Sequence, residues 1–312
     1  MPRRLLAYLV ALCAAVAAMG PALAGETVFP PGQRIGLAPP GDLKPSTRFP
    51  GFEDIDRKVT VTTLNLPPGT YADIERALRT QNQHGLTDVK QEAFSFHSGA
   101  GTLITARAQI KDVDIHKWIL LATAGAGKGL DIMIEVNVPD AALAVYSDAA
   151  IRQALASVTF RPSPITEQLG MLPFKLGELA GFRVVKVFPT GGVVMTEGPN
   201  DDVGNQPYLA IAIGGGAPEQ ANDRALFARD LLVSVPLRDL RLQSAEAMRI
   251  GGAPGYEIRA QATGPNNQPL LLVQWLRFRG GNFLRILGIA PKDNWDTLFT
   301  RFRAVRDGIE PQ

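Results

Sequence analysis

A pattern of apolar and polar positions recurs in the two halves of the chain. Residues 59–66 and 208–213 are rich in β-branched and other strand-favouring residues, and they predict a strand at the same place in each copy. Each stretch ends in a break rich in proline or glycine, at 67–69 and 214–216, and apolar residues at helical spacing follow it. Thr70 can cap the first of these helices. Each copy is therefore predicted to begin with a strand and a helix.

The second half of each pattern predicts four antiparallel strands. In both copies a strand reaches a turn of glycine and alanine and a second strand leaves it, and two further strands then meet at a glycine-containing turn. The matched segments are 94–109 and 248–261, 117–121 and 272–276, and 130–138 and 283–289. Because these pieces recur in one order at an offset of about 150 residues, we interpret them as an internal duplication.

Each copy closes with an amphipathic helix that follows a proline, Pro139 or Pro291. Asp148 and Asn294 are the expected N-caps of these helices. One apolar face of each helix carries Ile151, Leu155 and Val158 in the first copy and Trp295, Leu298, Phe299, Phe302 and Val305 in the second.

These elements predict an α+β chain of two tandem α/β/α sandwich domains, each an antiparallel sheet flanked by helices. The expected domains are residues 25–162 and 163–312. The proline-containing stretch 161–164 is the expected linker between them, held extended by its prolines.

The order of these pieces resembles the Mog1/PsbP-like fold. The resemblance is carried by segments 94–109 and 248–261, by the hairpins around Gly127 and Gly281, and by the two closing helices. It covers nearly the whole chain after the first 24 residues, as two tandem copies. It implies an accessory, assembly or binding protein rather than an enzyme, and it carries no catalytic motif onto this sequence.

The first 24 residues have the layout of a cleavable signal peptide. Arg3 and Arg4 precede an apolar run from Leu5 to Met19, and Ala22-Leu23-Ala24 forms a cleavage site before Gly25. The run is about 15 residues long, short of the roughly 20 needed to span a bilayer, so an uncleaved anchor is the less favoured alternative. Lipidation at Cys13 is disfavoured as well, because a leucine rather than a small residue precedes it.

Removal of residues 1–24 changes the charge and the cysteine content. That segment holds two of the 32 basic residues, none of the 30 acidic residues and the single cysteine. The mature chain is therefore neutral and free of disulfides, which disfavours a nucleic-acid partner and requires packed cores for stability. With no later apolar run of 18 residues, we expect a periplasmic or secreted protein that does not span the membrane after cleavage.

Catalytic and cofactor-binding motifs are not recognisable in the sequence, so no cofactor and no metal are expected. The three histidines, His84, His97 and His116, have no metal-ligand spacing. Residues 125–129 fail the phosphate-loop pattern because glycine follows the lysine where serine or threonine is required, and they are interpreted as a hairpin tip. There is neither a Gly-x-Ser-x-Gly motif nor a cysteine nucleophile in the mature chain.

One strand of the second copy carries the predicted binding residues. Alternation places Trp275, Arg277 and Arg279 on one sheet face, and Arg285 on the next strand is expected to belong to the same face. An aromatic ring beside several arginines can hold an anionic ligand or an acidic partner. The alternative is a solvated face on which arginine stems cover apolar surface.

Three functional hypotheses remain open from the sequence. The favoured one is a non-catalytic exported envelope protein that acts in binding or assembly, with another protein or a small anionic ligand as its partner. The others are a carrier of a small apolar or anionic ligand, which a deep apolar cavity would favour, and a hydrolase whose carboxylates the fold brings together, which a carboxyl pair with shifted pKa values would favour.

Overall fold

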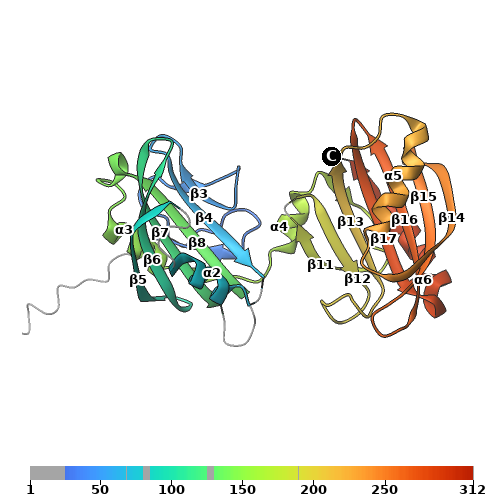
Figure 1. Ribbon diagram of the computed structural model, residues 1–312, viewed down its shortest axis with the longest axis horizontal. Helices are drawn as coiled ribbons and strands as arrows, with labels where there is room; N and C mark the ends of the chain where they lie inside the picture. Colours follow the sequence, from blue (N-terminus) through green and yellow to red (C-terminus); the bar gives the residue numbers. More distant parts are fainter. Residues whose placement is uncertain (1–24, 68, 80–84, 125–129, 189, 312) are drawn as a thin grey trace, which may run out of the picture. The chain divides into compact units, whose positions relative to one another are not determined.

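The computed structural model describes residues 25–67, 69–79, 85–124, 130–188 and 190–311. The chain divides into two compact units, residues 1–164 and 165–312 (Figure 1). The expected signal peptide and the hairpin tip at 125–129 lie outside the described residues. Within the described ranges, no helix is long and apolar enough to cross a membrane.

Unit 1 is built on a seven-stranded antiparallel sheet. Across the sheet, the strands are β2 (Lys44–Pro45), β3 (Gly51–Asp54), β4 (Val59–Leu66), β8 (Leu130–Pro139), β7 (Val113–Ala124), β6 (Gly99–Ile110) and β5 (Leu86–Phe96). The helical segments are α2 (Tyr71–Arg79), η1 (Asp140–Ala142) and α3 (Asp148–Ala156). A separate strand pair joins β1 (Ile35–Gly36) to β9 (Thr159–Phe160).

Unit 2 repeats this architecture strand for strand. Across its sheet lie β11 (Arg183–Phe188), β12 (Gly192–Thr196), β13 (Tyr208–Gly215), β17 (Asn282–Pro291), β16 (Pro269–Arg279), β15 (Ala253–Thr263) and β14 (Arg238–Ile250). Its helical segments are α4 (Ile165–Gly170), η2 (Ala221–Asp223), α5 (Arg224–Val233), η3 (Lys292–Asn294) and α6 (Trp295–Asp307). Here β10 (Phe174–Leu176) pairs with β18 (Ile309–Pro311).

The identical strand order confirms the predicted duplication and the predicted fold class. The strand–helix–four strands–helix order expected for each copy corresponds to β4 to α3 and to β13 to α6. The first two strands of each sheet were not predicted. Arg161, expected in the linker, instead belongs to unit 1, where its main-chain N–H donates to the carbonyl of Arg34 at 2.9 Å.

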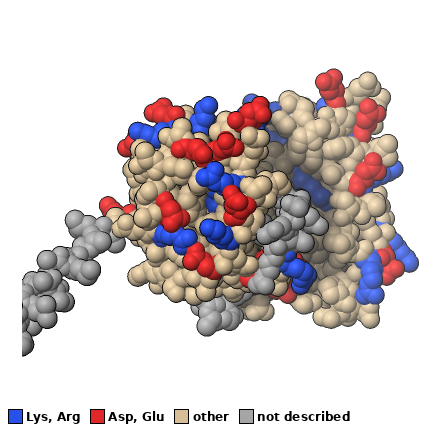
Figure 2. Space-filling view, turned by 60° about the vertical axis from the view of Figure 1, so that its left-hand side comes forward, with Lys and Arg blue, Asp and Glu red and all other residues tan. Residues whose placement is uncertain are grey.

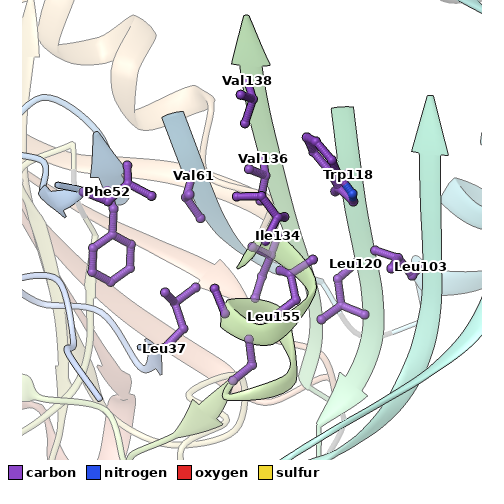
Figure 3. Packing of buried hydrophobic residues seen from close by; sticks show 14 of the residues in the cluster. Leu37, Phe52, Val61, Leu103, Trp118, Leu120, Ile134, Val136, Val138 and Leu155 are labelled. Atoms are coloured by element: carbon purple, nitrogen blue, oxygen red, sulfur yellow. The ribbon is translucent and has the colours of Figure 1, made fainter. Parts of the chain in front are cut away.

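Each sheet has a helix on both faces, so each unit is an α/β/α sandwich. In unit 1 the alternation of strand side chains sends Leu103, Trp118 and Leu120 into a core with α3, while Ile104 and Ile119 pack toward α2. Figure 3 shows the first of these cores, where Leu155 of α3 lies against the side chains of the central strands. In unit 2 the corresponding layers are formed with α6 and α5.

Two helix starts differ from the sequence-based expectation. Ser147, not Asp148, is the N-cap of α3, and its hydroxyl accepts the N–H of Ala150. At the start of α2 the hydroxyl of Thr70 donates to the carbonyl of Pro67, and the N–H of Tyr71 is bound instead by the buried carboxylate of Asp131. The N-cap position of α6 is Asn294 as predicted, although its side chain makes no capping hydrogen bond.

Asp131 remains ionised in this buried place because several donors surround it. Burial by itself would raise the pKa of its carboxyl group, but hydrogen bonds from the Thr123 hydroxyl and from the main chain of the turn before α2 lower the pKa below its ordinary value. A strand residue therefore fixes the start of the helix that covers it.

Glycine is required where β6 of unit 1 pairs with β7 close to the β5–β6 turn. A Cβ atom on Gly101 would lie 2.1 Å from the carbonyl oxygen of Leu121, and the equivalent atom on Gly255 of unit 2 would lie 2.8 Å from that of Leu276. Both glycines therefore allow a close approach of two backbones that any other residue would force apart.

Gly101→Ala is expected to lower the free energy of unfolding by about 1–3 kcal/mol, because the new methyl group overpacks a rigid sheet. Urea denaturation of the mature protein measures this change. Gly170→Ala is the control, since nothing lies within 4 Å of its Cβ position. Equal stability of the two variants would contradict the close approach.

A hydrogen-bonded carboxylate ties the β3–β4 hairpin of unit 1 to the segment before α3. The hydroxyl of Tyr146 donates to Asp54 Oδ2 at 2.7 Å, and Arg57 contacts the same oxygen at 2.9 Å. The hydrogen bond from Tyr146 is the main reason that the pKa of Asp54 falls to about 2, and burial is the main reason that the pKa of Tyr146 rises to about 12. The carboxylate thus stabilises the fold only while it is ionised.

Tyr146→Phe is expected to cost about 1.5–3 kcal/mol of stability near neutral pH, as for other hydrogen bonds to charged groups. Because the pKa of Asp54 is depressed in the folded state, this stabilisation is present above pH 3.8 and is lost as the pH falls toward about 2. The difference in unfolding free energy between wild type and variant should therefore shrink over that range. Tyr208→Phe in unit 2 is the control, and a pH-independent difference would contradict the assignment.

Candidate functional site

The first predicted binding residue, Trp275, is buried beneath α6. None of its surface is exposed, and its ring stacks on Phe299 with 6.0 Å between ring centroids. Its indole N–H donates to Glu257 Oε2 at 2.6 Å, and the guanidinium of Arg306 lies 4.8 Å from its ring centroid. Trp275 therefore holds α6 on the sheet rather than forming an exposed platform.

Arg285 lies on the opposite face of the sheet, so the expectation of one shared face was wrong. Its cross-strand partner is Leu276, whereas Trp275 pairs with Ile286. The guanidinium donates to the carbonyl of Leu231 in α5 at 2.8 Å, and burial lowers the pKa of Arg285. Its Nε atom is buried and has no hydrogen-bond partner among the described residues.

Only Arg277 and Arg279 remain together of the four predicted residues. Arg277 is half-buried and approaches the carbonyl of Ile309 at 3.4 Å, while Arg279 is exposed at the end of β16. Two arginines without the aromatic ring or the third guanidinium are not the surface that the sequence suggested.

A cleft of about 870 Å³ opens on the α3 side of unit 1 and is the better candidate site. It lies where the start of β5, the end of β6 and the start of β7 meet the segment that enters α3. Its lining residues are Leu86, Thr87, Asp88, Val89, Lys90, Thr105, Ala106, Arg107, His116, Lys117, Trp118, Leu143, Ser147 and Asp148.

The cleft exists because α3 is too short to cover the sheet. Its nine residues rise about 13 Å, whereas the twelve residues of β6 extend about 40 Å. The strand positions under α3 are apolar, and those beyond its N-terminus, including Arg107 and His116, are polar. At the first position of α3, unit 1 has Asp148, where the longer α6 of unit 2 has Trp295 stacked on Phe299.

Arg107 and Lys90 keep much of their hydrogen-bonding capacity, whereas Lys117 is paired with Glu135 at 2.5 Å. Arg107 lies 3.9 Å from both Asp88 and Asp140, which is too far for a hydrogen bond. Lys90 is exposed and forms no ion pair within the part of the chain that the structure describes. These groups can therefore bind a further acceptor without breaking a strong contact.

His116 adds a buried nitrogen to the same wall. Its Nε2 lies 3.2 Å from Asp140 Oδ1 without hydrogen-bond geometry, and it has no other partner among the described residues. Asp148, in contrast, is engaged on both oxygens, because it accepts the indole N–H of Trp118 at 2.8 Å and contacts Arg152 at 2.7 Å. The cleft therefore offers several donors and one loosely held carboxylate, Asp88.

Lys and Arg are intermixed with Asp and Glu on the face of unit 1 that Figure 2 shows. Across the described ranges, no three His, Cys, Asp or Glu side chains are grouped so that they could hold a metal ion.

The cleft residues were not predicted, although part of the signal is in the sequence. The two-residue turn between Ile110 and Val113 sets Arg107 directly opposite His116. The pattern of side chains did not predict the cleft itself. The cleft depends on the length of α3 and on the position of η1 near the strand ends.

Comparison with known proteins gives likeness in structure only. No protein-family model and no curated protein matches this chain. The solution structure of cyanobacterial PsbP (CyanoP) from Synechocystis sp. PCC 6803 is 19% identical and covers 45% of this chain and 87% of its own, with a TM-score of 0.33. The Saccharomyces cerevisiae Ran-binding protein Mog1p is 8% identical over 45% of this chain and 90% of its own, with a TM-score of 0.34.

A third similar structure extends over both units. The T6SS immunity protein TplEi from Pseudomonas aeruginosa is 12% identical and covers 91% of this chain and 96% of its own, with a TM-score of 0.30. PsbP and Mog1p are the proteins after which the expected fold is named, and the likeness is one of structure. At these identities it concerns the fold and not the activity.

Arg285→Met is expected to leave the free energy of unfolding within about 1 kcal/mol of wild type or to raise it, because it removes a half-buried guanidinium whose Nε is buried and unpaired. Met133 holds the equivalent fourth position of β8 in unit 1, where it packs in the apolar layer. Thermal and urea denaturation measure the effect. The reciprocal change Met133→Arg should be clearly destabilising, and a large loss in Arg285→Met would show that the guanidinium is needed to hold α5.

Proposed function

We propose that this protein is a non-catalytic binding protein of the cell envelope that receives a segment of another protein in the cleft of unit 1. The observation that carries the proposal is the unclaimed hydrogen-bonding capacity of Arg107 and Lys90, two exposed cations in one open cleft. Arginine can hold a carboxylate or a main-chain carbonyl through two parallel hydrogen bonds.

The exposure of the cleft supports a polypeptide over a small carried molecule. The side chains of Arg107 and Asp88, which line the cleft, are 49% and 72% exposed. Sites for small ligands enclose most of the ligand surface and are predominantly apolar, whereas transient protein interfaces are polar and solvated at the rim. Apolar side chains such as Leu86 and Leu143 line part of the wall and provide contact area for the segment.

The proposal includes export of the protein from the cytoplasm. The N-terminal layout of charge, apolar run and small-residue site supports export and cleavage before Gly25. A neutral mature chain without cysteine is consistent with binding another protein in the periplasm or outside the cell.

The test is site-specific photocrosslinking in the cell that makes the protein. A photoreactive residue at Thr87, on the cleft wall, should give a crosslinked partner, and one at Thr300 on the exposed side of α6 should not. Changing Lys90 and Arg107 together to Gln should reduce the crosslink about tenfold while the thermal melt stays within a degree or two, because both side chains are exposed.

Two outcomes would contradict the proposed function in different ways. An unchanged crosslink in the double variant would exclude these cations from the interface. A small anion that remains with the purified protein in native mass spectrometry, and is lost from the double variant, would replace the polypeptide by a carried ligand.

A further inference from the structure

The charged wall of the cleft in unit 1 is not a requirement of the fold. Arg107 of β6 lies directly opposite His116 of β7, and in unit 2 Gln261 of β15 lies directly opposite Leu271 of β16. Arg107 and Gln261 both hold the ninth position of their strands, so the two pairs are equivalent. One copy of the fold therefore forms with an uncharged pair at the place where the other has a cation and a titratable ring.

His116 holds one ring nitrogen against a carboxylate. The nitrogen, Nε2, lies 3.2 Å from Asp140 Oδ1, which is within ion-pair distance, but it is buried and makes no hydrogen bond in the part of the chain that the structure describes. Asp140 follows the proline that ends β8, and unit 2 has Lys292 at the equivalent place after β17. A proton on Nε2 converts the contact with Asp140 into an ion pair. His116 can therefore gain a charged partner when it binds a proton.

Charged groups on several elements surround His116. From β8, its cross-strand partner is the apolar Val138. The charged side chains that line the cleft or lie beside His116 are Asp88 and Lys90 of β5, Arg107 of β6, Asp114 and Lys117 of β7, Asp140 of η1 and Asp148 of α3. Asp148 and Lys117 are already in ion pairs. Asp140 lies within ion-pair distance of the ring, so it is the carboxylate that pairs with a protonated His116.

Protonation of His116 also changes the surroundings of Arg107. The carboxylate of Asp140 approaches both side chains, with Oδ2 at 3.9 Å from the guanidinium of Arg107 and Oδ1 at His116. Once His116 carries a charge, it neutralises Asp140 and adds a positive neighbour directly opposite Arg107. The electrostatic potential in the cleft therefore becomes more positive, which strengthens the attraction of an anion.

We propose that the segment bound in the cleft presents an Asp or Glu side chain to Arg107 and Lys90, and that protonation of His116 strengthens this contact. The contact rests on the proposed function, because it lies in the same cleft, and it specifies the chemistry of the segment and the pH at which it binds best. The loosely held groups of the lining are these two cations and one carboxylate, Asp88, so charge complementarity favours an acidic segment. An apolar residue beside the acid can contact the leucines that line the cleft.

The experiment selects random twelve-residue peptides, displayed on phage at the amino end of a coat protein, for binding to the purified mature protein at about pH 5.5, where a histidine is ordinarily protonated. A displayed peptide has no free carboxyl terminus, so an enriched carboxylate belongs to a side chain. We expect peptides in which Asp or Glu stands next to an apolar residue. One of them, synthesised without histidine and with blocked ends, should bind about tenfold more tightly at about pH 5.5 than at about pH 8 in fluorescence anisotropy.

Matched variants separate the charge of His116 from the rest of the cleft. His116→Gln should bind the peptide with one affinity at both pH values, whereas His97→Gln, which changes an exposed histidine outside the cleft lining, should keep the pH dependence of wild type. Lys90→Gln combined with Arg107→Gln should weaken binding about tenfold or more at either pH. His116→Leu, which introduces the residue of the equivalent position in unit 2, provides the test if His116→Gln does not fold.

Three results would overturn an acid-strengthened contact with an acidic segment. They are a failure to enrich any peptide, enriched peptides without an excess of Asp and Glu, and a pH dependence that is absent from wild type or unchanged in His116→Gln. The proposed function has its own test, since it fails when no protein is crosslinked at Thr87 in the cell, whatever the purified protein binds. A crosslink at Thr87 together with any of the three results would keep the function and reject the acid-strengthened contact.

Discussion

A short helix cannot cover a long sheet, and the architecture of both units follows from this mismatch. The four long strands of each sheet, β5–β8 and β14–β17, run ten to thirteen residues. The helices that pack on them have nine to thirteen residues but less than half the rise per residue. Apolar side chains are therefore gathered under the helix, as with Leu103, Leu120 and Ile134 under α3. The uncovered ends of the strands have to be polar, and a cleft forms wherever nothing else folds over them.

The duplicated fold resolves this mismatch differently in its two copies. In unit 2 the closing helix is four residues longer and brings Trp295 and Phe299 over the sheet, and Trp275 stacks beneath them. In unit 1 the helix begins with Asp148, which is engaged by Trp118 and Arg152, and the polar strand ends stay accessible. On the other face of the sheet, unit 2 is the more polar of the two units. Arg285 and Gln274 interrupt its apolar layer, whereas Met133 and Ile119 are part of the corresponding layer in unit 1.

Local pattern in the sequence was sufficient to predict most of the fold. The strand predicted at 59–66 is β4 residue for residue, and the order of pieces was sufficient to recognise the duplication. Strands β2 and β3 have two and four residues among prolines and glycines, which is too short for a two-residue period to be visible. The cap at Ser147 was missed because Asp148 beside it is an equally good capping residue type.

The candidate site was harder to predict than the fold, because it depends on register and burial. The turn at Gly280-Gly281 pairs Arg279 with Asn282, and counting back from this turn puts Arg285 opposite Leu276 and away from Trp275. The position of Arg285 could therefore have been predicted from the sequence. The burial of Trp275 could not, because it depends on the position of α6 and on Glu257 as an acceptor for the indole N–H.

The short strand pairs β1–β9 and β10–β18 bring the beginning of each unit next to its end. In each unit a strand near the start of that unit is hydrogen-bonded to a strand that follows the closing helix. The path of the chain through each unit is therefore nearly a closed loop. A new start and end could therefore be cut at an exposed turn while the old ends are joined by a few residues, which is the requirement for circular permutation. The same closure means that a unit can be copied or inserted as a complete block, and a tandem pair is the product expected from such copying.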